Sequence, residues 1–262
     1  MNPELYYEQS RIWEKNFLDN PFWAQKARVM TAMIPSDVRT ILDVGCGNGA
    51  MANILVNTYE VYGADRSKAA LSSLSIPRVC CESDRIPFKS AAFDLVLCSE
   101  ILEHLPGRSY TNTIREIKRL SLGYILLSVP FKENLRFRFM RCAVCKGIFH
   151  VWGHVRRFDL SSIRKHFCEY QVLQWAHCGV YSRDYHPILC RIRQKIAGVW
   201  FCGEGSHPLC PKCGNTKFPA QPHTFLSRLC DDINARLGHQ TAKTPYWLVV
   251  LLRKRENSNV LH

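Results

Sequence analysis

Three glycines at alternate positions form the segment whose chemistry is easiest to interpret. Gly45, Gly47 and Gly49 follow the apolar segment 40–44, which predicts a buried strand, and precede a predicted helix over 51–57. Glycine lets a backbone approach a ligand without steric conflict at Cβ. The first turn of the next helix offers N–H groups that have no partner within the helix. The spacing therefore predicts a loop that binds a nucleotide or a related ligand.

An acidic residue, Asp65, ends a second predicted strand over 60–64. An acid at this place in a βαβ unit typically accepts hydrogen bonds from ribose hydroxyls. The usual dinucleotide loop has the spacing G-x-G-x-x-G, which this chain lacks. Its pattern D-x-G-x-G-x-G, which begins at Asp43, instead resembles the first motif of class I methyltransferases that depend on S-adenosylmethionine (SAM).

Further segments resemble the ubiquinone-biosynthesis-like, or type 11, branch of that family. Segment 82–88 looks like the turn that meets adenine, and segment 93–106 looks like the fourth strand with the loop after it. Segment 115–130 resembles the helix and fifth strand that follow. The sequence Gly-His-Val-Arg-Arg-Phe at 153–158 is similar to a G-H-x-R-x-F motif near the substrate. The close resemblance covers residues 38–131 and resumes at this motif and at the last predicted strand.

The resemblance implies a set of residues that hold the methyl donor. The glycine loop would surround the methionyl part, and the strand-end acid would hold the ribose. Asp84 competes with Glu82 for the adenine contact, because the register of this turn is uncertain from one sequence. Asp43 has a second interpretation as an organiser of the loop, and Glu100 as a helix cap. The implied donor residues are Asp43, Gly45, Gly47, Gly49, Asp65, Arg66, Glu82, Ser83, Ser99 and Glu100.

Two histidines are the candidate catalytic groups. Methyl transfer from a sulfonium is an in-line displacement, so positioning and exclusion of water supply much of the acceleration. An oxygen or nitrogen acceptor also calls for a base, and histidine titrates near neutral pH. The resemblance puts His154 and His104 nearest the acceptor, and a structural role is the alternative for each. Arg156 and Arg157 would either bind an anionic group of the acceptor or lie at the surface.

Two C-x-x-C pairs predict a second chemistry, metal binding. Cys142 with Cys145 and Cys210 with Cys213 both resemble zinc knuckles, each followed by a glycine. Two such pairs complete a tetrahedral site of four thiolates even when they lie far apart in the sequence. The spacing predicts one closed, structural Zn²⁺ ion that ties two segments together as a lid over the donor.

Other ligand sets remain open at this point. His150 and His154 follow the first pair closely enough to form a site of two thiolates and two imidazoles. Cys202 and His207 precede the second pair and would serve it in the same way. These alternatives predict two separate ions, or one ion in which a histidine replaces a cysteine.

The elements that position these residues alternate between strands and helices. This alternation predicts an α/β fold, a doubly wound seven-stranded Rossmann-like methyltransferase sheet with ligand sites at the carboxyl ends of its strands. Asp159 is the expected N-cap of a helix that ends near Phe167. The predicted strands cover 40–44, 60–64, 79–81, 93–98, 123–129, 170–175 and 246–253.

The chain divides into a core, an N-terminal cap and two insertions. Residues 1–36 form an aromatic-rich helical cap that either covers the substrate or packs on the core as an ordinary apolar face. The SAM-binding core is expected at 37–131, 154–178 and 245–255. The insertions at 132–153 and 179–244 would form the zinc-clamped lid. The aromatic residues of the cap are Tyr6, Tyr7, Trp13, Phe17, Phe22 and Trp23.

Composition limits the location and the partners. The first residues show no basic and apolar signal segment and no apolar run reaches membrane-spanning length, so a cytoplasmic protein with reduced cysteines is expected. The net charge of +13 arises in residues 131–262, where 21 basic and 8 acidic side chains give 21 − 8 = +13. This excess indicates an anionic substrate, nucleic acid or a membrane surface, unless it is simply a solvated exterior.

The resemblance favours an enzyme over other functions. The leading hypothesis is a SAM-dependent methyltransferase for a small-molecule, lipid-linked or glycan-linked acceptor. The alternative is an RNA or protein methyltransferase that docks through its basic, zinc-stabilised half. A third hypothesis is a SAM-binding regulator without an acceptor pocket, because a fold alone does not establish activity.

Overall fold

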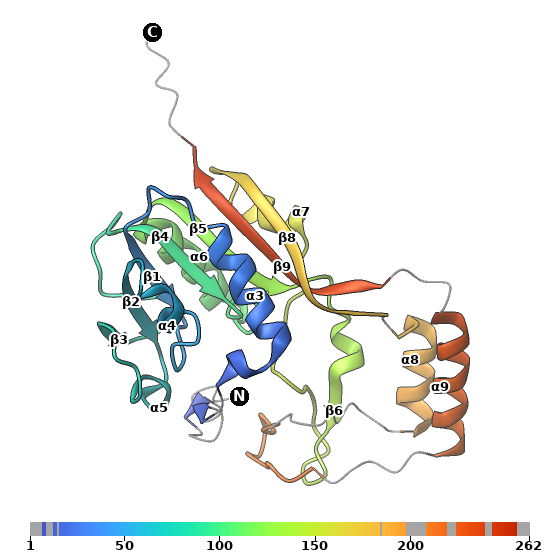
Figure 1. Cartoon of the computed structure of the whole chain (residues 1–262). Helices are drawn as coiled ribbons and strands as arrows, with labels where there is room; N and C mark the ends of the chain where they lie inside the picture. Colours follow the sequence, from blue (N-terminus) through green and yellow to red (C-terminus); the bar gives the residue numbers. More distant parts are fainter. Residues whose placement is uncertain are drawn as a thin grey trace.

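A seven-stranded sheet forms the centre of the molecule (Figure 1). The computed structural model describes residues 7–8, 13–14, 16–183, 185–197, 208–218, 224–238 and 243–255. Cys202 and His207 lie outside these ranges. The strands, in the order in which they neighbour one another, are β3 (Arg78–Cys80), β2 (Glu60–Asp65), β1 (Thr40–Val44), β4 (Phe93–Ser99), β5 (Ser121–Pro130), β9 (Thr244–Lys254) and β8 (Tyr170–Ser182).

The direction of the strands matches the predicted fold class. β1 pairs in parallel with β2 and β4, and β3 and β5 extend the parallel set on either side. β9 runs antiparallel to both of its neighbours, β5 and β8. The predicted α/β fold with a Rossmann-like methyltransferase sheet is therefore confirmed. The carboxyl ends of β1, β2 and β4 meet at one edge, which brings the glycine loop, Asp65 and Glu100 into one region.

Alternating side chains divide the core into two layers. In β4, Val96 and Cys98 belong to one buried cluster, and Leu95 and Leu97 belong to the other. This period of two is what a strand covered on both faces requires. α6 (Gly107–Leu120) and α7 (Leu160–His166) cover the first face. The second face is covered by α3 (Pro21–Ala32), α4 (Ala52–Leu55) and α5 (Lys68–Leu71).

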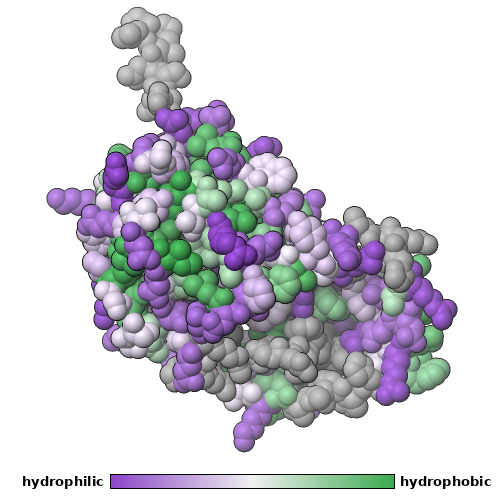
Figure 2. Space-filling model, viewed as in Figure 1, coloured by the Kyte–Doolittle hydropathy of each residue, from purple (hydrophilic) through white to green (hydrophobic). Residues whose placement is uncertain are grey.

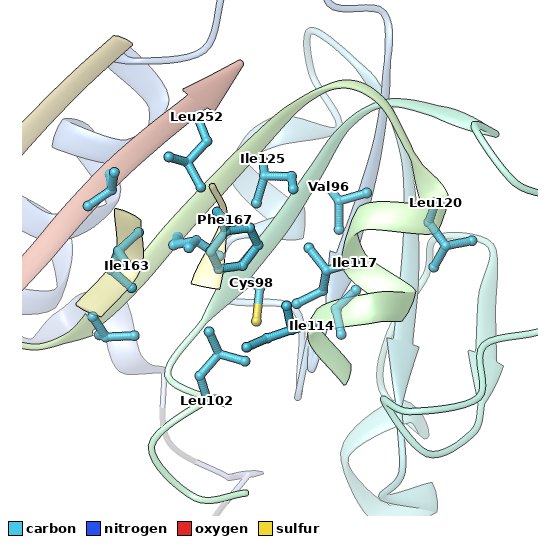
Figure 3. Packing of buried hydrophobic residues seen from close by; sticks show 14 of the residues in the cluster. Val96, Cys98, Leu102, Ile114, Ile117, Leu120, Ile125, Ile163, Phe167 and Leu252 are labelled. Carbon is cyan, nitrogen blue, oxygen red and sulfur yellow. The ribbon is translucent and has the colours of Figure 1, made fainter. Parts of the chain in front are cut away.

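Figure 3 shows the first of these clusters. Ile114, Ile117 and Leu120 of α6 point toward the sheet, where they meet side chains such as Val96. Phe167, which follows α7, is 1% exposed and fills the same layer. These residues recur at a spacing of three or four, as expected of the apolar stripe of a helix.

Most predicted strands differ from the observed ones by one or two residues at their ends, and the differences are larger at α4 and β8. α4 covers only Ala52–Leu55, whereas the pattern predicted a helix over 51–57. β8 continues to Ser182, past the predicted end at 175, because the chain remains paired with β9 through a register shift between Cys178 and Tyr181. The predicted cap is present: Asp159 accepts the N–H of Ser162 and begins α7.

Two insertions extend from the carboxyl-end side of the sheet. The first contains the turn η2 (Leu135–Arg138) and a small hairpin of β6 (Phe139–Arg141) and β7 (Ile148–His150). The second contains the paired helices α8 (Pro187–Ala197) and α9 (Phe225–Gly238), which lie beyond the hairpin in Figure 1. Figure 2 shows hydrophobic and hydrophilic side chains mixed on the surface of this helical pair. None of the described helices is long and apolar enough to cross a membrane.

The buried layer between α6 and the sheet generates a stability prediction. Leu120 is 0% exposed, whereas Leu122, two residues later, is 56% exposed. We expect Leu120→Ala to lower the free energy of unfolding by about 2–5 kcal/mol, through lost burial and a residual cavity. Leu122→Ala, the matched control, should change it by roughly 0.5 kcal/mol or less. Urea denaturation of both variants measures the difference, and equal losses would contradict the assigned core.

Candidate functional site

The glycine loop is conformationally and sterically restricted to glycine. Gly45, Gly47 and Gly49 all have positive φ, at 71°, 53° and 86°. A Cβ on Gly45 would lie 1.6 Å from Cδ1 of Ile101, and a Cβ on Gly49 would lie 2.2 Å from Cδ1 of Leu74. Any other residue would therefore be strained in φ and would collide with its neighbours. The loop lies tightly against the segment after β4.

Asp65 fixes the loop onto the end of β2. Its carboxylate accepts the N–H of Gly47 at 2.9 Å and the N–H of Ser67 at 2.8 Å. Burial raises the pKa of Asp65, although these backbone N–H groups oppose the rise. Asp43, on the neighbouring strand, is 3% exposed, and burial together with the charge of Asp65 raises its pKa to about 8. Two buried acids at adjacent strand ends favour a cationic ligand, and the sulfonium of SAM is a cation.

The N-terminal segment lies across this loop. A Cβ on Gly47 would be 2.7 Å from Cζ3 of Trp13, so the indole ring packs directly on the glycine. Asn48 Nδ2 donates to the carbonyl of Trp13, and Ser67 Oγ donates to the carbonyl of Tyr7. The ring of Tyr7 also contacts the ring of His104, with centroids 6.0 Å apart. These residues are placed as a cover over the strand ends.

Other aromatic residues of the predicted cap pack on the core instead. Trp23, on α3, meets Trp247 of β9 edge to face at 5.1 Å and also contacts Phe17. Packing on the core therefore holds for Trp23 and Phe17, and cover of a substrate by Tyr7 and Trp13 stays a prediction. Tyr6 lies outside the described residues.

The predicted adenine turn follows β3. Glu82 is exposed, and its Oε1 lies 3.5 Å from Nη2 of Arg66. Ser83 Oγ is 2.9 Å from Oγ1 of Thr113 on α6, so this hydroxyl faces the helix. The N–H of Cys81 donates to the carbonyl of Asp65, which keeps the turn beside the ribose candidate. The structure thus brings Arg66 and Glu82 next to Asp65, and their contact with a nucleoside stays a prediction.

Glu100 follows β4 and is held in an ionic and aromatic setting. Its φ is 58°, and its carboxylate accepts Ser128 Oγ at 3.1 Å and Trp247 Nε1 at 2.8 Å. Lys26 Nζ lies 3.5 Å from Glu100 Oε1 and 3.2 Å from Ser99 Oγ. Glu100 is therefore anchored by β5, β9 and α3 rather than acting as a simple helix cap.

Lys26 is almost completely buried, at 1% exposed. Its ammonium group lies over the rings of Trp23 and Trp247, 3.9 and 4.6 Å from their centroids. Burial lowers the pKa of Lys26, while Glu100 and Glu103 oppose the shift. Cation–π contacts and the ion pair together compensate for the lost hydration.

The two predicted catalytic histidines meet in one buried cluster. His154 is 5% exposed, and its ring lies 4.7 Å from that of His104, centroid to centroid. His154 Nδ1 is 2.5 Å from Oε2 of Glu133. Burial opposes the charged form of Glu133, but His150 and His154 outweigh it and lower its pKa to about 2. Burial, followed by the neighbouring imidazoles, lowers the pKa of His104 to about 3.

The predicted anion-binding arginine is engaged elsewhere. Arg156 Nε donates to the carbonyl of Leu105 at 2.9 Å, and its guanidinium stacks 3.8 Å from the centroid of the Tyr110 ring. Arg157 is exposed. Arg156 therefore packs against α6, and Arg157 lies at the surface. This agrees with the alternative in which the two arginines do not bind the acceptor.

The four predicted cysteine ligands come together. Sγ of Cys142 is 3.6 Å from Sγ of Cys213, and Sγ of Cys145 is 3.5 Å from Sγ of Cys210. All four sulfur atoms lie within 4.8 Å of one another. Burial opposes ionisation of Cys142, but the backbone N–H groups of Cys145 and Val144 outweigh it and lower the pKa of this thiol to about 6. The arrangement fits a tetrahedral thiolate site.

The two cysteine turns have the same backbone form. The N–H of Lys146 donates to the carbonyl of Cys142, and the N–H of Gly214 donates to the carbonyl of Cys210. Each of these donors has positive φ, at 59° and 72°. In the first turn the left-handed residue is thus Lys146, and not the glycine after it as the sequence suggested. A Cβ on Gly147 would lie 2.9 Å from Cδ of Lys212, an exposed and flexible side chain.

The local alternative with two cysteines and two histidines is wrong. His150 and His154 point into the cluster with Glu133, which holds both rings. The chain turns away from the cysteines after β7, where Gly153 has a φ of 75°. The described cysteines are all free thiols rather than disulfides. The alternative that uses Cys202 and His207 falls outside the described residues.

Three residues of this site were not found from the sequence. Lys26, Glu103 and Glu133 are all buried, and each meets its partners through contacts between distant segments. Glu103 directly precedes His104 in the segment that resembles the methyltransferase motif, so this position was the one available signal. Nothing in the local sequence marks Lys26 or Glu133.

Comparisons with known proteins agree with this geometry. Residues 42–123 match a family model described as "Methyltransferase domain". An uncharacterized protein of Methanocaldococcus jannaschii is 33% identical over 99 residues, which are 36% of this chain and 42% of that protein. The chain therefore spans less than half of that relative's length. These findings show that residues 42–123 resemble a methyltransferase domain, in agreement with the fold.

Solved structures share the fold at low sequence identity. One is a chain from the complex between the Haloferax volcanii Trm112 methyltransferase activator and a methyltransferase, with 14% identity, a TM-score of 0.57, and coverage of 97% of this chain and 98% of that chain. Another is a SAM-dependent methyltransferase from Archaeoglobus fulgidus, with 13% identity, a TM-score of 0.55 and coverage of 97% and 100%. The [4+2]-cyclase SpnF matches as well, with 15% identity, a TM-score of 0.52 and coverage of 88% and 81%. The fold is thus shared with a protein named for another reaction.

The loop geometry predicts a contribution of Asp65 to donor binding. We expect Asp65→Ala to weaken SAM binding by roughly one to two orders of magnitude, because charge-assisted hydrogen bonds are lost and the loop loses its anchor. Isothermal titration calorimetry measures the affinity. Glu60→Ala, at the exposed start of the same strand, is the matched control and should bind SAM as the parent does. An unchanged affinity of the Asp65 variant would remove this residue from the donor site.

The sulfur cluster predicts one bound zinc ion per chain. We expect Cys210→Ser to release it, because a hydroxyl is a poor replacement for a thiolate ligand. The β6–β7 hairpin and residues 208–218 should then exchange amide hydrogens faster. Metal analysis by mass spectrometry and hydrogen exchange measure these changes, and Cys168→Ser, an exposed cysteine outside the cluster, is the control. Purified parent protein without zinc would contradict the assignment.

Proposed function

We propose that this protein transfers the methyl group of SAM to an oxygen, nitrogen or carbon atom of a small-molecule, lipid-linked or glycan-linked acceptor in the cytoplasm. The observation that carries the proposal is the meeting of the buried His154 ring with the partly exposed ring of His104, 4.7 Å apart between centroids. His154 is 5% exposed, and the ring of Tyr7 contacts that of His104. An acceptor atom that must reach such a covered histidine suits a small or extended molecule better than the surface of a folded polymer.

In this proposal the glycine loop and Asp43 surround the methionyl part of the donor, and Asp65 holds its ribose. Glu133 is a positioning residue, because it holds His154 through Nδ1 and leaves Nε2 available to the acceptor. The methyl group moves to the acceptor while both electrons of the broken carbon–sulfur bond stay on sulfur. The products are the methylated acceptor and S-adenosylhomocysteine. Exclusion of water by the N-terminal segment contributes to the rate.

The same proposal assigns a structural Zn²⁺ ion to Cys142, Cys145, Cys210 and Cys213. Such an ion would be closed to substrate, because four thiolates fill a tetrahedral shell. Its contribution would be to hold the β6–β7 hairpin against residues 208–218, which supports the segment that leads to His154.

An RNA or protein acceptor is the second candidate. The observation in its favour is charge, since residues 131–262 carry 21 basic and 8 acidic side chains. A nucleic-acid enzyme should bind bulk RNA tightly at low salt, with an affinity that falls steeply as salt rises. Binding that is weak at 50 mM salt would favour the small acceptor.

Radiolabelled SAM tests the acceptor class directly. Purified protein is incubated with SAM labelled in the methyl group and, in separate reactions, with a metabolite and lipid extract, total RNA, and protein. We expect the label to enter the metabolite and lipid fraction. Label in RNA or protein alone would contradict the proposal and support the second candidate.

His154 generates a kinetic prediction. Loss of a group that activates the acceptor typically costs 10²–10⁴-fold in rate. We expect His154→Asn to slow the formation of S-adenosylhomocysteine by about this factor, while the affinity for SAM changes only slightly. His166→Asn, a histidine of α7 away from the cluster, is the control. A rate like that of the parent would remove His154 from the acceptor site.

A further inference from the structure

Buried polar atoms without hydrogen-bond partners gather at one place. Among the residues that the structure describes, they include both carboxylate oxygens of Glu103, Oε1 of Glu133 and Nε2 of His150. Glu103 is 0% exposed, and the other two residues are 9% and 5% exposed. A buried polar atom without a partner costs free energy, so such atoms are rare in folded proteins. Oε1 of Glu133 and Nε2 of His150 lie 3.5 Å apart and face each other, so the two carboxylate oxygens of Glu103 are the atoms that point to a bound group.

The spacing of the cluster matches the size of a metal ion. One ligand atom each from Glu103, His104 and His154 lies within 4.8 Å of the others. Nε2 of His104 is 3.9 Å from Oε1 of Glu103. Ligand atoms that each lie about 2 Å from one ion are separated by roughly 3 Å or slightly more. A small contraction of these side chains would bring them to coordination distance.

The contacts of a histidine ring indicate which of its two nitrogen atoms keeps a lone pair for a metal ion. His154 faces Glu133 with Nδ1, which makes Nδ1 the donor and leaves the lone pair on Nε2. Nδ1 of His104 lies on the side of Gly153, and its Nε2 lies 3.9 Å from Oε1 of Glu103. Nε2 is thus the ring nitrogen of His104 that faces Glu103. In metal sites, the ring nitrogen of a histidine that does not bind the metal usually donates a hydrogen bond to a carboxylate or a carbonyl.

His150 has the opposite arrangement. Its Nδ1 accepts the N–H of Trp152 at 3.3 Å and the N–H of His154 at 3.1 Å. A neutral imidazole that accepts at Nδ1 carries its proton on Nε2, which here lies 3.5 Å from Oε1 of Glu133. His150 therefore has no lone pair for a metal and serves to orient Glu133.

The charge of the region also favours a divalent cation. Glu100, Glu103 and Glu133 are buried or partly buried carboxylates, and Lys26 lies against Glu100. Lys26 offsets one negative charge, and the charge of a divalent ion would offset the other two.

We propose that Glu103, His104 and His154 bind a divalent transition-metal ion, separate from the cysteine cluster, whose open coordination positions take an oxygen atom of the acceptor. Two imidazoles and one carboxylate suit Zn²⁺, Mn²⁺ or Fe²⁺ and leave positions free for substrate. The inference rests on the proposed function and narrows it to acceptors with a hydroxyl group. The ion would replace His154 as the direct activator of that hydroxyl.

The position of the cluster fits this role. Ile101, which lies against Gly45, connects the glycine loop to Glu103 and His104 within one short segment. The acceptor hydroxyl would bind the ion as an oxyanion after its proton passes to solvent. A carbon–oxygen bond to the methyl group would form as the carbon–sulfur bond breaks, with both electrons of the latter retained by sulfur.

Manganese is the probe that separates the two metal sites. Thiolate sites disfavour Mn²⁺, whereas carboxylate and imidazole ligands accept it. Protein that retains its cysteine-bound zinc is washed with a mild chelator and titrated with Mn²⁺, and free Mn²⁺ is followed by electron paramagnetic resonance. We expect the parent to bind one Mn²⁺ per chain. If the ion isolated with the protein is zinc, metal analysis should find two equivalents.

Variants assign the ligands. Substitution of a residue that hydrogen-bonds to a metal ligand typically lowers the metal affinity 10- to 100-fold. We therefore expect about this loss of Mn²⁺ affinity for Glu133→Gln, and a loss of at least about 100-fold for the ligand variant Glu103→Gln. His104→Asn is a second ligand variant in case the first does not fold, which thermal unfolding monitors. Glu169→Gln, at a surface ion pair with Lys118, is the control. Cys210→Ser should lose only the cysteine-bound zinc and should still bind Mn²⁺.

Two results would overturn the site: no Mn²⁺ and no second zinc in the parent, or Mn²⁺ binding by folded Glu103→Gln and His104→Asn as tight as in the parent. Calorimetry with SAM on the same samples separates this inference from the proposed function. SAM binding and methyl transfer without a second metal would reject the site and leave the methyltransferase intact. Metal binding without SAM binding would reject the proposed function and leave the site.

Discussion

The carboxylate of Glu133 holds two imidazoles and thereby fixes the geometry of the acceptor side. Oε2 faces Nδ1 of His154, and Oε1 lies 3.5 Å from Nε2 of His150. A buried carboxylate is costly unless it is paired, so this arrangement strongly favours one orientation of both rings. Glu133 follows β5, whereas His150 ends β7 and His154 follows the hairpin. The contact therefore closes the first insertion on itself and directs Nε2 of His154 toward His104 and Glu103.

The cysteine cluster supports the same geometry from the other end of the hairpin. β6 and β7 pair over only three residues each, and an isolated two-stranded hairpin of this length is marginally stable. Cys142 and Cys145 lie in the turn that joins the strands, and Met140, Phe149 and Cys210 form a small buried cluster beside them. A crosslink between this turn and residues 208–218 supplies stability that the short strands lack. The end of the hairpin near His150 is thus held by the contacts of Glu133 with the histidines. The turn end is held by the cysteine cluster.

Patterns within short segments explain what was predictable from the sequence. The strand periodicity, the glycine spacing and the acid at the end of β2 each follow from local rules, and the fold class was correct for that reason. The two C-x-x-C pairs were matched across the chain because four thiolates have few other uses in a reduced protein. Glu133 and Lys26 were missed, since their roles arise from pairing between distant segments. The local histidine alternative failed because Glu133, a residue of another segment, holds the imidazoles of both His150 and His154.

Lys26 connects the donor side to this acceptor side. Its burial between Trp23 and Trp247 is tolerated because Glu100 pairs with it, and the pair fixes α3 to the end of β4. α3 continues from the N-terminal segment whose Trp13 covers the glycine loop, so the same ion pair influences where that cover lies. Glu100 is also close enough to Glu103 to raise its pKa. A change in the charge of Glu100 would consequently shift the pKa of both Lys26 and Glu103.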